Sequence, residues 1–510
     1  MNRIARYFLT CLVALTTATG GYGQPTDLVT THGRHFKYAS QTFRFVGVNI
    51  RGLCHYGTPS LPYANSSHVT QNLDAVQAMG GKVVRIFAAN RLYSNADNIT
   101  RLTNVLNLME ARGLKAIVCL TDYYFGTDFH PQGDDAYYSA GLLTPAWFNG
   151  GYLTNYKPWV GAVVNALKNH NAVFAWQIGN ELTAYTPPGT TSAYIVPFTQ
   201  DIAAYIKSID PWHMVSTGYL SAWHILQADT AAARALYQDP NIDFFSYHTY
   251  NGDDDLRSWT VHAGVEKPFV VDEFGWNTGP SRAASLLADL NKWYDTRLAA
   301  GVMQWGFQAQ AMDIGDGDNA VGMDSYAHGD YATLYNIYQT RAAALTPQPL
   351  PSIAPPQGTN AALGATWQTS TNFSGAYAGD KALDGIVSAA SKWTSANAAP
   401  PQWLAVDLGA VRNINGYVVR MAADATEDAH YDFLAYQIQT GASFGGPWTT
   451  QFTVSNPAQY GVMRSVHTSP VAARFVRLLV TNPGVDNYAR LPEFEVFVGP
   501  NAGVGDWTLY

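Results

Sequence analysis

The sequence predicts an α/β protein in which a (β/α)8 (TIM) barrel is followed by an all-β sandwich. Up to about residue 345, short runs rich in Val, Ile and Phe alternate with segments whose apolar residues recur every three to four positions. A proline-rich stretch follows, and beyond it short β-rich segments are separated by turn residues. These observations indicate two domains of different class.

Length and composition exclude several classes of protein. The chain has 510 residues, of which 47% are hydrophobic and 13% charged, so it is neither disordered nor a small disulfide scaffold. The net charge is −8 and no run of basic residues occurs, so no nucleic-acid partner is expected. Aromatic residues make up 13% of the chain. This favours a flat, neutral, polyhydroxylated ring as ligand, because a ring of that kind stacks on aromatic side chains.

The N-terminus has the pattern of a secretory signal. Arg3 and Arg6 precede an apolar stretch at 7–18, and small residues follow it. We expect a signal peptide at 1–23, a secreted or periplasmic protein, and no membrane span. The mature chain keeps Cys54 and Cys119, for which two buried thiols are favoured and a disulfide stays open.

The repeating pattern before residue 345 predicts the barrel. Near-continuous apolar strands separated by helices form a parallel sheet, and eight such units over about 320 residues fit a closed barrel. An open doubly wound sheet is the alternative. The predicted strands are 43–50, 83–88, 115–122, 173–181, 214–219, 243–250, 268–275 and 301–308. The predicted helices are 69–80, 98–113, 159–170, 194–209 and 283–300.

Proline marks the domain boundary. Residues 346–360 contain five prolines and no charge, as in semi-rigid spacers. The predicted domains are therefore 24–345 and 361–510, and we expect them to share little interface. The predicted strands of the second domain include 402–408, 411–420, 433–440 and 474–480.

Two carboxylates end predicted strands of the barrel. The fourth strand ends at Asn180-Glu181, and the seventh contains Glu273 before Phe274-Gly275. Strand C-termini form the active face of such barrels, so these glutamates can converge. Two-carboxylate glycoside hydrolysis requires that arrangement, whereas structural ion pairs at strand ends are the alternative.

Over about residues 30–345 the sequence resembles glycoside hydrolase family 5, in the clan of retaining (β/α)8 glycosidases. The resemblance is carried by motifs in the same order as in the family. They are Val84-Arg85-Ile86-Phe87, Gly179-Asn180-Glu181, Tyr247-His248-Thr249-Tyr250, Glu273-Phe274-Gly275 and Gln304-Trp305-Gly306.

The resemblance implies roles for these residues. Glu181 is the expected acid/base and Glu273 the expected nucleophile, which Arg85 and Tyr250 keep ionised and oriented. Arg85 as a mere interior ion partner is the alternative.

Three supporting residues are implied as well. Asn180 is expected to bind the sugar 2-hydroxyl, His248 to lie beside the acid/base, and Trp305 to floor the subsite of the cleaved sugar. A core histidine and a core tryptophan are the alternatives for the last two.

The end of the third strand bears on the substrate. Many family members carry a histidine there, whereas this chain continues Asp122-Tyr123-Tyr124-Phe125-Gly126, which resembles the mannan-cleaving branch. We therefore expect an endo-β-1,4-mannanase; a β-glucanase or cellulase, an exo-β-glycosidase, and a non-enzymatic surface lectin or adhesin are alternatives. Sugar platforms or packed loop anchors are expected at Tyr56, Tyr93, Tyr124, Trp147, Tyr185, Trp223 and Trp276.

No catalytic cofactor is expected. The acidic run 313–324 lacks the register of a calcium-binding EF-hand, so a solvated loop is predicted there. His/Cys metal spacing and phosphate-binding glycine loops are absent from the sequence. A polysaccharide is the expected partner, and a monomer the expected state.

The C-terminal region, about 360–499, resembles the discoidin or coagulation-factor type C family, which includes family 32 carbohydrate-binding modules. The resemblance implies a carbohydrate-binding sandwich with a structural calcium held by Asp384 and Glu493, although Ile386 stands where a polar ligand is common. The matching motifs are Ala382-Leu383-Asp384-Gly385, Lys392-Trp393, 403–409, 473–477 and 493–496.

Overall fold

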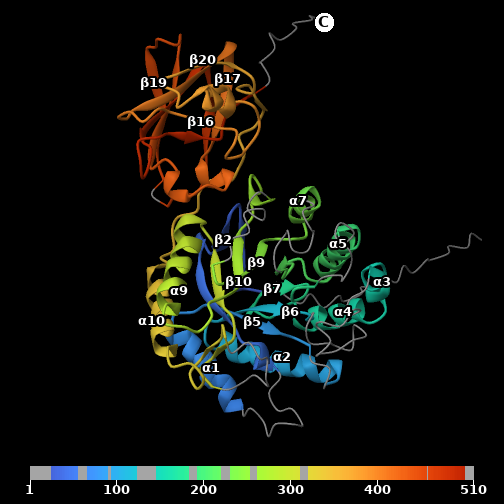
Figure 1. The fold of residues 1–510 in the computed structure, drawn as a ribbon. Helices are drawn as coiled ribbons and strands as arrows, with labels where there is room; N and C mark the ends of the chain where they lie inside the picture. Colours follow the sequence, from blue (N-terminus) through green and yellow to red (C-terminus); the bar gives the residue numbers. More distant parts are fainter. Residues whose placement is uncertain are drawn as a thin grey trace, which may run out of the picture.

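The computed structural model has two domains with separate hydrophobic cores (Figure 1). It describes residues 25–54, 66–89, 93–122, 145–182, 192–219, 230–252, 261–310, 320–456 and 458–499. The expected signal peptide, 1–23, lies outside the described residues.

The first domain is built on one parallel sheet of eight strands in the order β8-β7-β6-β5-β4-β11-β10-β9. The edge strands meet where Asp243 N donates to Val215 O (2.8 Å) and Val215 N donates to Asp243 Oδ2 (2.7 Å). The sheet is therefore a closed barrel, as predicted, and not an open one. Its strands are β4 (Phe45–Asn49), β5 (Val83–Phe87), β6 (Lys115–Cys119), β7 (Val173–Gln177), β8 (Met214–Ser216), β9 (Phe245–Tyr250), β10 (Phe269–Gly275) and β11 (Gly301–Gln304).

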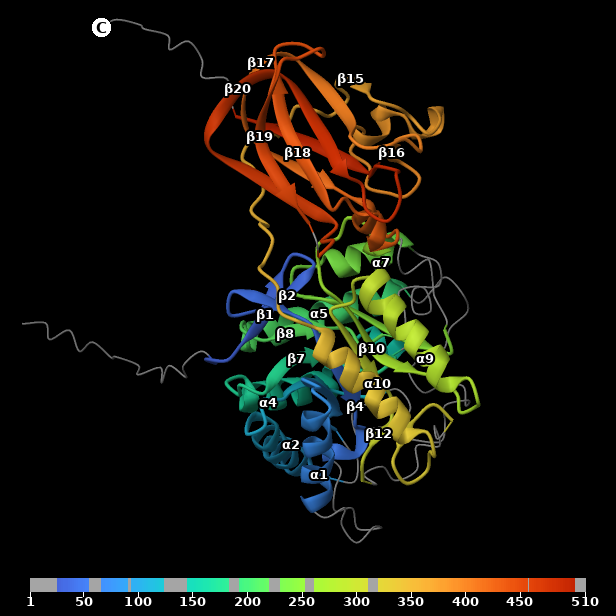
Figure 2. The same ribbon diagram turned by 90° about the vertical axis from the view of Figure 1, so that its left-hand side faces the viewer.

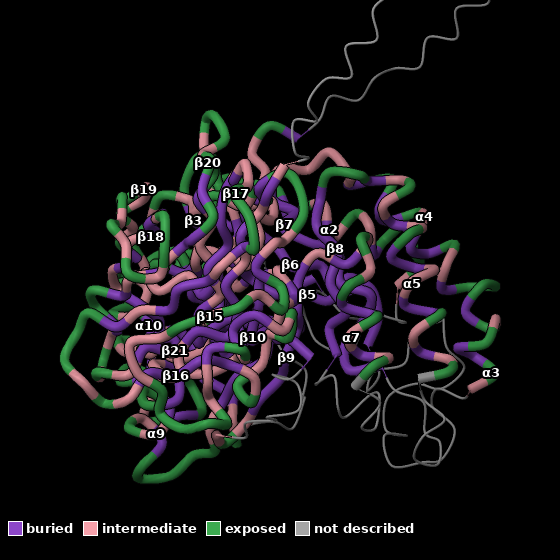
Figure 3. The backbone as a smooth tube through the Cα atoms, turned by 90° about the horizontal axis from the view of Figure 1, so that it is seen from above, coloured by how far each residue is buried: buried purple, intermediate pink, exposed green. Residues whose placement is uncertain are grey.

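Helices surround the barrel, whose strands are buried along most of their length (purple in Figure 3). The helices are α1 (Ser66–Ala78), α2 (Asn95–Glu110), α3 (Pro145–Phe148), α4 (Tyr156–Leu167), α5 (Ser192–Ile209), α7 (Thr230–Gln238), α9 (Arg282–Asn291) and α10 (Tyr331–Ala344). The helix predicted at 283–300 is too long, because the backbone passes into a π-helical turn at Lys292–Thr296.

A small antiparallel sheet closes the N-terminal end of the barrel. It consists of β1 (Val29–His32), β2 (His35–Tyr38) and β3 (Gln41–Phe43). Phe36 projects from it onto Phe174 and Phe244, with ring centroids 4.9 and 5.3 Å apart. Aromatic packing thus fills this end, and the strand C-termini form the other.

The second domain is antiparallel and all-β, as predicted. Its two long strands, β17 (Gln402–Arg420) and β20 (Val462–Asn482), pair along most of their length. β18 (Ala435–Gly441), β19 (Trp448–Ser455) and β22 (Glu493–Val498) complete the main sheet with β14 (Thr359–Asn360) and β15 (Thr366–Thr369). The last two residues of the predicted linker therefore already belong to this domain, as β14.

The expectation of little interface between the domains is wrong. Arg34 of the β1–β2 turn forms an ion pair with Asp424 over 2.8 Å, and the Asp424 side chain has no exposed surface. Glu266 pairs with both Arg420 (3.4 Å) and Arg464. Complementary charges on segments far apart in the sequence thus dock one domain on the other.

The linker is also fixed to the barrel. Thr42 N donates to Gln348 O (2.8 Å), and Gln348 N donates to Thr42 Oγ1 (2.9 Å). Farther along, Tyr460 of the second domain donates to Pro349 O (2.8 Å). The proline content predicts a free spacer. Instead, the backbone at Gln348 and Pro349 pairs with the edge of β3.

The second domain lies at the N-terminal end of the barrel (Figure 2). Its barrel contacts, Arg34, Glu266 and Arg297, precede the first residues of β2, β10 and β11 respectively. The strand C-termini, where the two glutamates lie, are at the opposite end. Cys54 and Cys119 are free and buried, which confirms the prediction of two thiols.

Candidate active site

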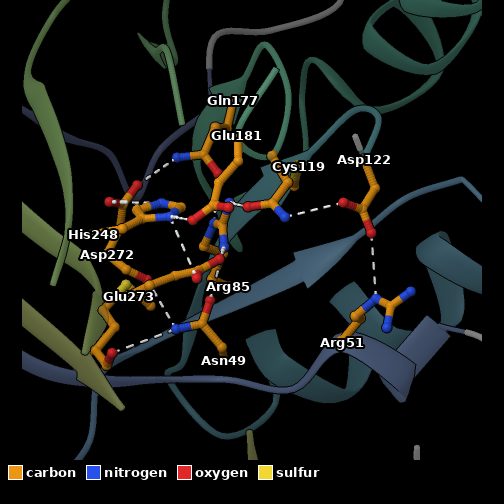
Figure 4. Close-up of polar contacts among 12 residues, drawn as sticks. Asn49, Arg51, Arg85, Cys119, Asp122, Gln177, Glu181, His248, Asp272 and Glu273 are labelled. Atoms are coloured by element: carbon orange, nitrogen blue, oxygen red, sulfur yellow. Dashed lines mark hydrogen bonds and ion pairs between the residues drawn. The ribbon is translucent and has the colours of Figure 1, made fainter. Parts of the chain in front are cut away.

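Arg85 of β5 is the centre of a buried polar network (Figure 4). Its guanidinium has no exposed surface and donates to Glu273 Oε1 (2.5 Å), Asn180 Oδ1 (2.8 Å), Asn49 Oδ1 (3.1 Å) and Gln177 Oε1 (2.5 Å). Four hydrogen bonds from one planar fork hold its partners rigidly. Arg85 thereby joins strands β4, β5, β7 and β10 at one point.

Glu273 of β10 is 3% exposed and accepts hydrogen bonds on both oxygens. Arg85 donates to Oε1, and the Tyr250 hydroxyl donates to Oε2 over 2.7 Å. Burial raises the pKa of Glu273 to about 7, while His248, Arg85 and Tyr250 oppose that rise by stabilising the carboxylate.

Glu181 faces Glu273 across His248. His248 Nδ1 lies 2.6 Å from Glu181 Oε1 and 3.3 Å from Glu273 Oε2. One oxygen of each glutamate and a ring nitrogen of His248 all lie within 4.8 Å of one another. Burial lowers the pKa of His248, but the surrounding carboxylates outweigh it and the net pKa is raised.

The backbone at Glu181 is strained. Its φ is +49°, in the left-handed region that few non-glycine residues occupy. Glu181 N donates to Gly218 O (2.9 Å), and Gly218 itself has φ +74°. A Cβ on Gly218 would lie 2.2 Å from Gly179 O, so only glycine fits there.

Trp305, which follows β11, completes the predicted set. It is 6% exposed, and its ring centroid lies 6.3 Å from that of Phe87, over which Arg85 is positioned at 5.0 Å. The barrel mouth therefore brings together all seven residues expected from the sequence, Arg85, Asn180, Glu181, His248, Tyr250, Glu273 and Trp305.

Five polar residues of the network were not predicted. Asp122 accepts from Asn180 Nδ2 (3.0 Å) and pairs with Arg51 Nε (3.3 Å). Asn49 and Gln177 orient Arg85, and Asp272 accepts from Gln177. The available signal was a polar side chain inside an otherwise apolar strand, such as Gln177 or Asp272.

Three of the expected sugar platforms, Tyr93, Trp147 and Trp276, lie within the described residues. Trp147 is 6% exposed and packs on Phe148 and Phe198, so it is an anchor. Tyr93 lies half-buried under Arg101 at 3.9 Å, and Trp276 is half-buried. The remaining candidates lie outside the described residues: Tyr56, Tyr124, Tyr185 and Trp223.

The acidic run 313–324 is described only at its end. Asp324 belongs to β13 (Met323–Asp324) and is buried, with His328 Nδ1 3.6 Å away. The prediction of a solvated loop is therefore wrong for Asp324. Asp313, Asp316 and Asp318 lie outside the described residues.

Within the described ranges, Glu181, His248 and Glu273 are the one cluster of three His, Cys, Asp or Glu ligand atoms at metal-like spacing. Arg85 contacts the same carboxylate. The positive charge of Arg85 would repel a metal ion bound at this cluster. The two carboxyl groups and the imidazole suit proton transfer instead.

In the second domain, Glu493 is 2% exposed and its Oε1 has no hydrogen-bond partner, while Oε2 accepts from Gly385 N (3.2 Å). Burial raises the pKa of Glu493 to about 8, and neighbouring Asp384 adds to the rise. A buried oxygen without a donor, next to a second carboxylate, fits a hard cation.

A closed (β/α)8 barrel with two opposed glutamates, one just beyond its fourth strand and one near the C-terminal end of its seventh, defines a glycoside hydrolase of the two-carboxylate type. The chain belongs to glycosyl hydrolase family 5: the family described as Cellulase (glycosyl hydrolase family 5) matches residues 39–310. The F5/8 type C domain matches residues 366–494, which confirms the second resemblance.

Several similar proteins carry mannanase names. Mannan endo-1,4-beta-mannosidase F of Aspergillus fumigatus is 27% identical over 294 residues, 49% of this chain and 64% of that protein. Mannan endo-1,4-beta-mannosidase A of Podospora anserina is 27% identical over 315 residues, 53% of this chain and 79% of that protein. The endo-1,4-beta-mannanase structure from Rhizomucor miehei is 19% identical, covers 62% of this chain and 99% of its own, and has a TM-score of 0.49.

Proposed function

We propose that this protein hydrolyses internal β-1,4 bonds of mannan with retention of anomeric configuration. The carrying observation is the Glu181–His248–Glu273 arrangement, with one oxygen of each carboxyl group within 4.8 Å of the other. Retaining enzymes hold their carboxyl groups about 5–5.5 Å apart, whereas inverting enzymes leave about 6.5–9.5 Å for a water. The spacing supports direct attack by a carboxylate.

In the first step Glu273 Oε2 or Oε1 attacks the anomeric carbon while Glu181 gives its proton to the departing oxygen. Arg85 and Tyr250 direct the lone pairs of Glu273 and stabilise its carboxylate, which limits the rise in pKa that burial causes. The bond to the leaving sugar breaks, and an ester between the sugar and Glu273 forms.

In the second step Glu181, now ionised, takes a proton from water, whose oxygen attacks the same carbon and releases Glu273. Asn180 is fixed between Arg85 and Asp122, at the expected place for binding the 2-hydroxyl. Trp305 and Phe87 supply the apolar floor under this sugar.

Mannan is the first choice of substrate for two reasons. The third strand is followed by Asp122-Tyr123, where many family members have a histidine, and the similar proteins have mannanase names. A reducing-sugar assay on mannan, glucomannan, cellulose and mixed-linkage β-glucan tests it. Mannan hydrolysis with oligosaccharide products is expected. Predominant glucan hydrolysis supports a β-glucanase, monosaccharide as sole product supports an exo-glycosidase, and binding without hydrolysis supports a lectin.

The second domain is proposed to bind the polysaccharide through its exposed loops. Phe373 is 56% exposed and lies edge-on to Tyr377 and Tyr488, with centroids 6.0 and 5.8 Å away. Arg490 lies 5.3 Å from the Tyr488 ring. Retention on insoluble mannan should fall in Phe373→Ala and stay unchanged in the exposed apolar control Val411→Ala.

We further propose that Asp384 and Glu493 hold a structural calcium, since Glu493 Oε1 lacks a donor. Catalysis requires no cofactor in this scheme. Export is also proposed, from the 1–23 pattern, and N-terminal sequencing of the exported protein tests it. A monomeric state is proposed separately, and light scattering tests it. Among the described helices, none is long and apolar enough to cross a bilayer.

A further inference from the structure

Asp272 is a carboxylate in the barrel interior, adjacent to Glu273 in the sequence. Successive residues of a regular strand point to opposite faces, but the pairing of β10 with β9 shifts register between Val271 and Glu273. Such a bulge re-aims side chains, and here both acidic groups face the barrel interior (Figure 4). Asp272 has no exposed surface.

Asp272 accepts hydrogen bonds from three donors. Gln177 Nε2 lies 2.6 Å from Oδ2, the Ser246 hydroxyl contacts the same oxygen, and Tyr247 N lies 3.0 Å from Oδ1. Gln177 cannot reverse its amide, because its Oε1 accepts from Arg85. This donor set fits an ionised carboxylate, the form that only accepts.

The imidazole of His248 lies between Asp272 and Glu181. Asp272 Oδ1 is 3.4 Å from His248 Nε2, an ion-pair distance without a hydrogen bond, and Glu181 Oε1 is hydrogen-bonded to Nδ1 over 2.6 Å. Glu273 Oε2 also approaches Nδ1, at 3.3 Å, and Arg85 of β5 lies beyond Glu273. The ring therefore faces carboxylates from the segment that follows β7 and from β10.

We propose that Asp272 is a positioning residue that keeps His248 cationic, with its Nδ1–H directed at Glu181. Arg85 and His248 then carry one positive charge each, and Asp272 and Glu273 one negative charge each. The buried site is neutral when Glu181 holds the proton that it must donate. Without the Asp272 charge, the site with protonated Glu181 and cationic His248 has a net positive charge. A positive site favours loss of the Glu181 proton or the His248 proton at lower pH.

The test is Asp272→Asn, which keeps the shape, removes the charge and replaces one accepting oxygen by an NH2 donor, as the control below also does. We expect kcat/KM to fall on the order of 10- to 100-fold and its basic limb to move about one pH unit lower, because a positive site releases its proton more easily. The matched control is Asp210→Asn, since Asp210 is also fully buried and contacts His213 Nδ1 over 2.7 Å, outside the active site. An unchanged basic limb in folded Asp272→Asn overturns the inference.

A measurement on the unaltered enzyme covers the case in which Asp272→Asn does not fold. The ¹⁵N shifts of His248, assigned with His248→Gln, should show an imidazolium at pH values where an ordinary histidine, of pKa about 6.5, is neutral. A neutral ring there overturns the inference. The inference rests on the proposed function for the role of Glu181, but this titration needs no substrate. Mannan hydrolysis with a neutral His248 therefore refutes only the role of Asp272, and absence of hydrolysis with a cationic His248 refutes only the function.

Discussion

The Arg85 guanidinium donates to the Glu273 carboxylate over 2.5 Å, and neither side chain is more than 4% exposed. The contact joins the second and seventh strands of the barrel and opposes the cost of burying the Glu273 charge. His248 and Tyr250 reach the other oxygen of Glu273. The site thus keeps a buried anion available for attack.

Replacing each of the two glutamates by alanine should impair a different step of the reaction. With Glu273→Ala the covalent intermediate cannot form, so turnover falls by at least about 10³-fold and azide restores it as the glycosyl azide of inverted configuration. With Glu181→Ala, substrates with good leaving groups still form the ester because they need no proton. Glu110→Ala, in the helical shell, is the control. If azide rescued Glu181→Ala and not Glu273→Ala, giving the glycosyl azide of inverted configuration, Glu181 would be the nucleophile and Glu273 the acid/base.

Tyr250→Phe should move the acidic limb of the kcat/KM profile to higher pH. The nucleophile must be ionised, so activity is lost as pH falls through the pKa of Glu273, which burial raises to about 7. Loss of the 2.7 Å donor raises that pKa further, by about one unit. Tyr152→Phe removes a similar hydrogen bond, to Asp201 outside the site, and should leave the limb in place. A downward shift in Tyr250→Phe contradicts the assignment.

Removal of the second domain should destabilise the barrel without removing its activity on short soluble substrates. A chain ending at Leu345 loses the Gln348 pairing with Thr42 and exposes His35, which packs on Tyr460 at 4.6 Å. Its Tm should be lower than that of a chain ending at Ser352, which keeps the β3 pairing. In the full chain, Asp424→Asn should weaken docking by about 3 kcal/mol and separate two thermal transitions. Equal Tm values for both truncations would mean that the linker pairing contributes nothing.

Calcium should replace a proton at Glu493. A carboxyl whose folded pKa is about 8 holds its proton more tightly than in the unfolded chain, so without metal the second domain loses stability as pH rises from about 4.5 to about 8. Calcium should raise its Tm at the upper end of this range and little at the lower end. Glu493→Gln should abolish both the pH dependence and the calcium effect on Tm. Asp380→Asn, which changes an exposed carboxyl group of the same domain, should abolish neither. A metal effect that survives Glu493→Gln contradicts the site.

The sequence predicted the barrel well because a parallel sheet covered by helices requires apolar strands, and these are visible without knowing the pairing. Glu181 and Glu273 were found because they end such strands. Asn49, Gln177 and Asp272 stand out only as polar residues in apolar runs. Such a run does not reveal which of its residues face the barrel axis, and the β10 bulge that turns Asp272 inward cannot be predicted from the sequence. The docking of Arg34 on Asp424 was missed because its charges are 390 positions apart.

The most direct test of the central claim, attack by Glu273 with retention, is covalent trapping. Wild-type enzyme is incubated with a 2-deoxy-2-fluoro β-mannosyl fluoride, whose fluorine slows the second step, and the labelled peptide is identified by mass spectrometry. The label should lie on Glu273, be absent from Glu273→Ala, and decay to product of unchanged anomeric configuration. A label on Glu181 or elsewhere, or product of inverted configuration, would contradict the mechanism.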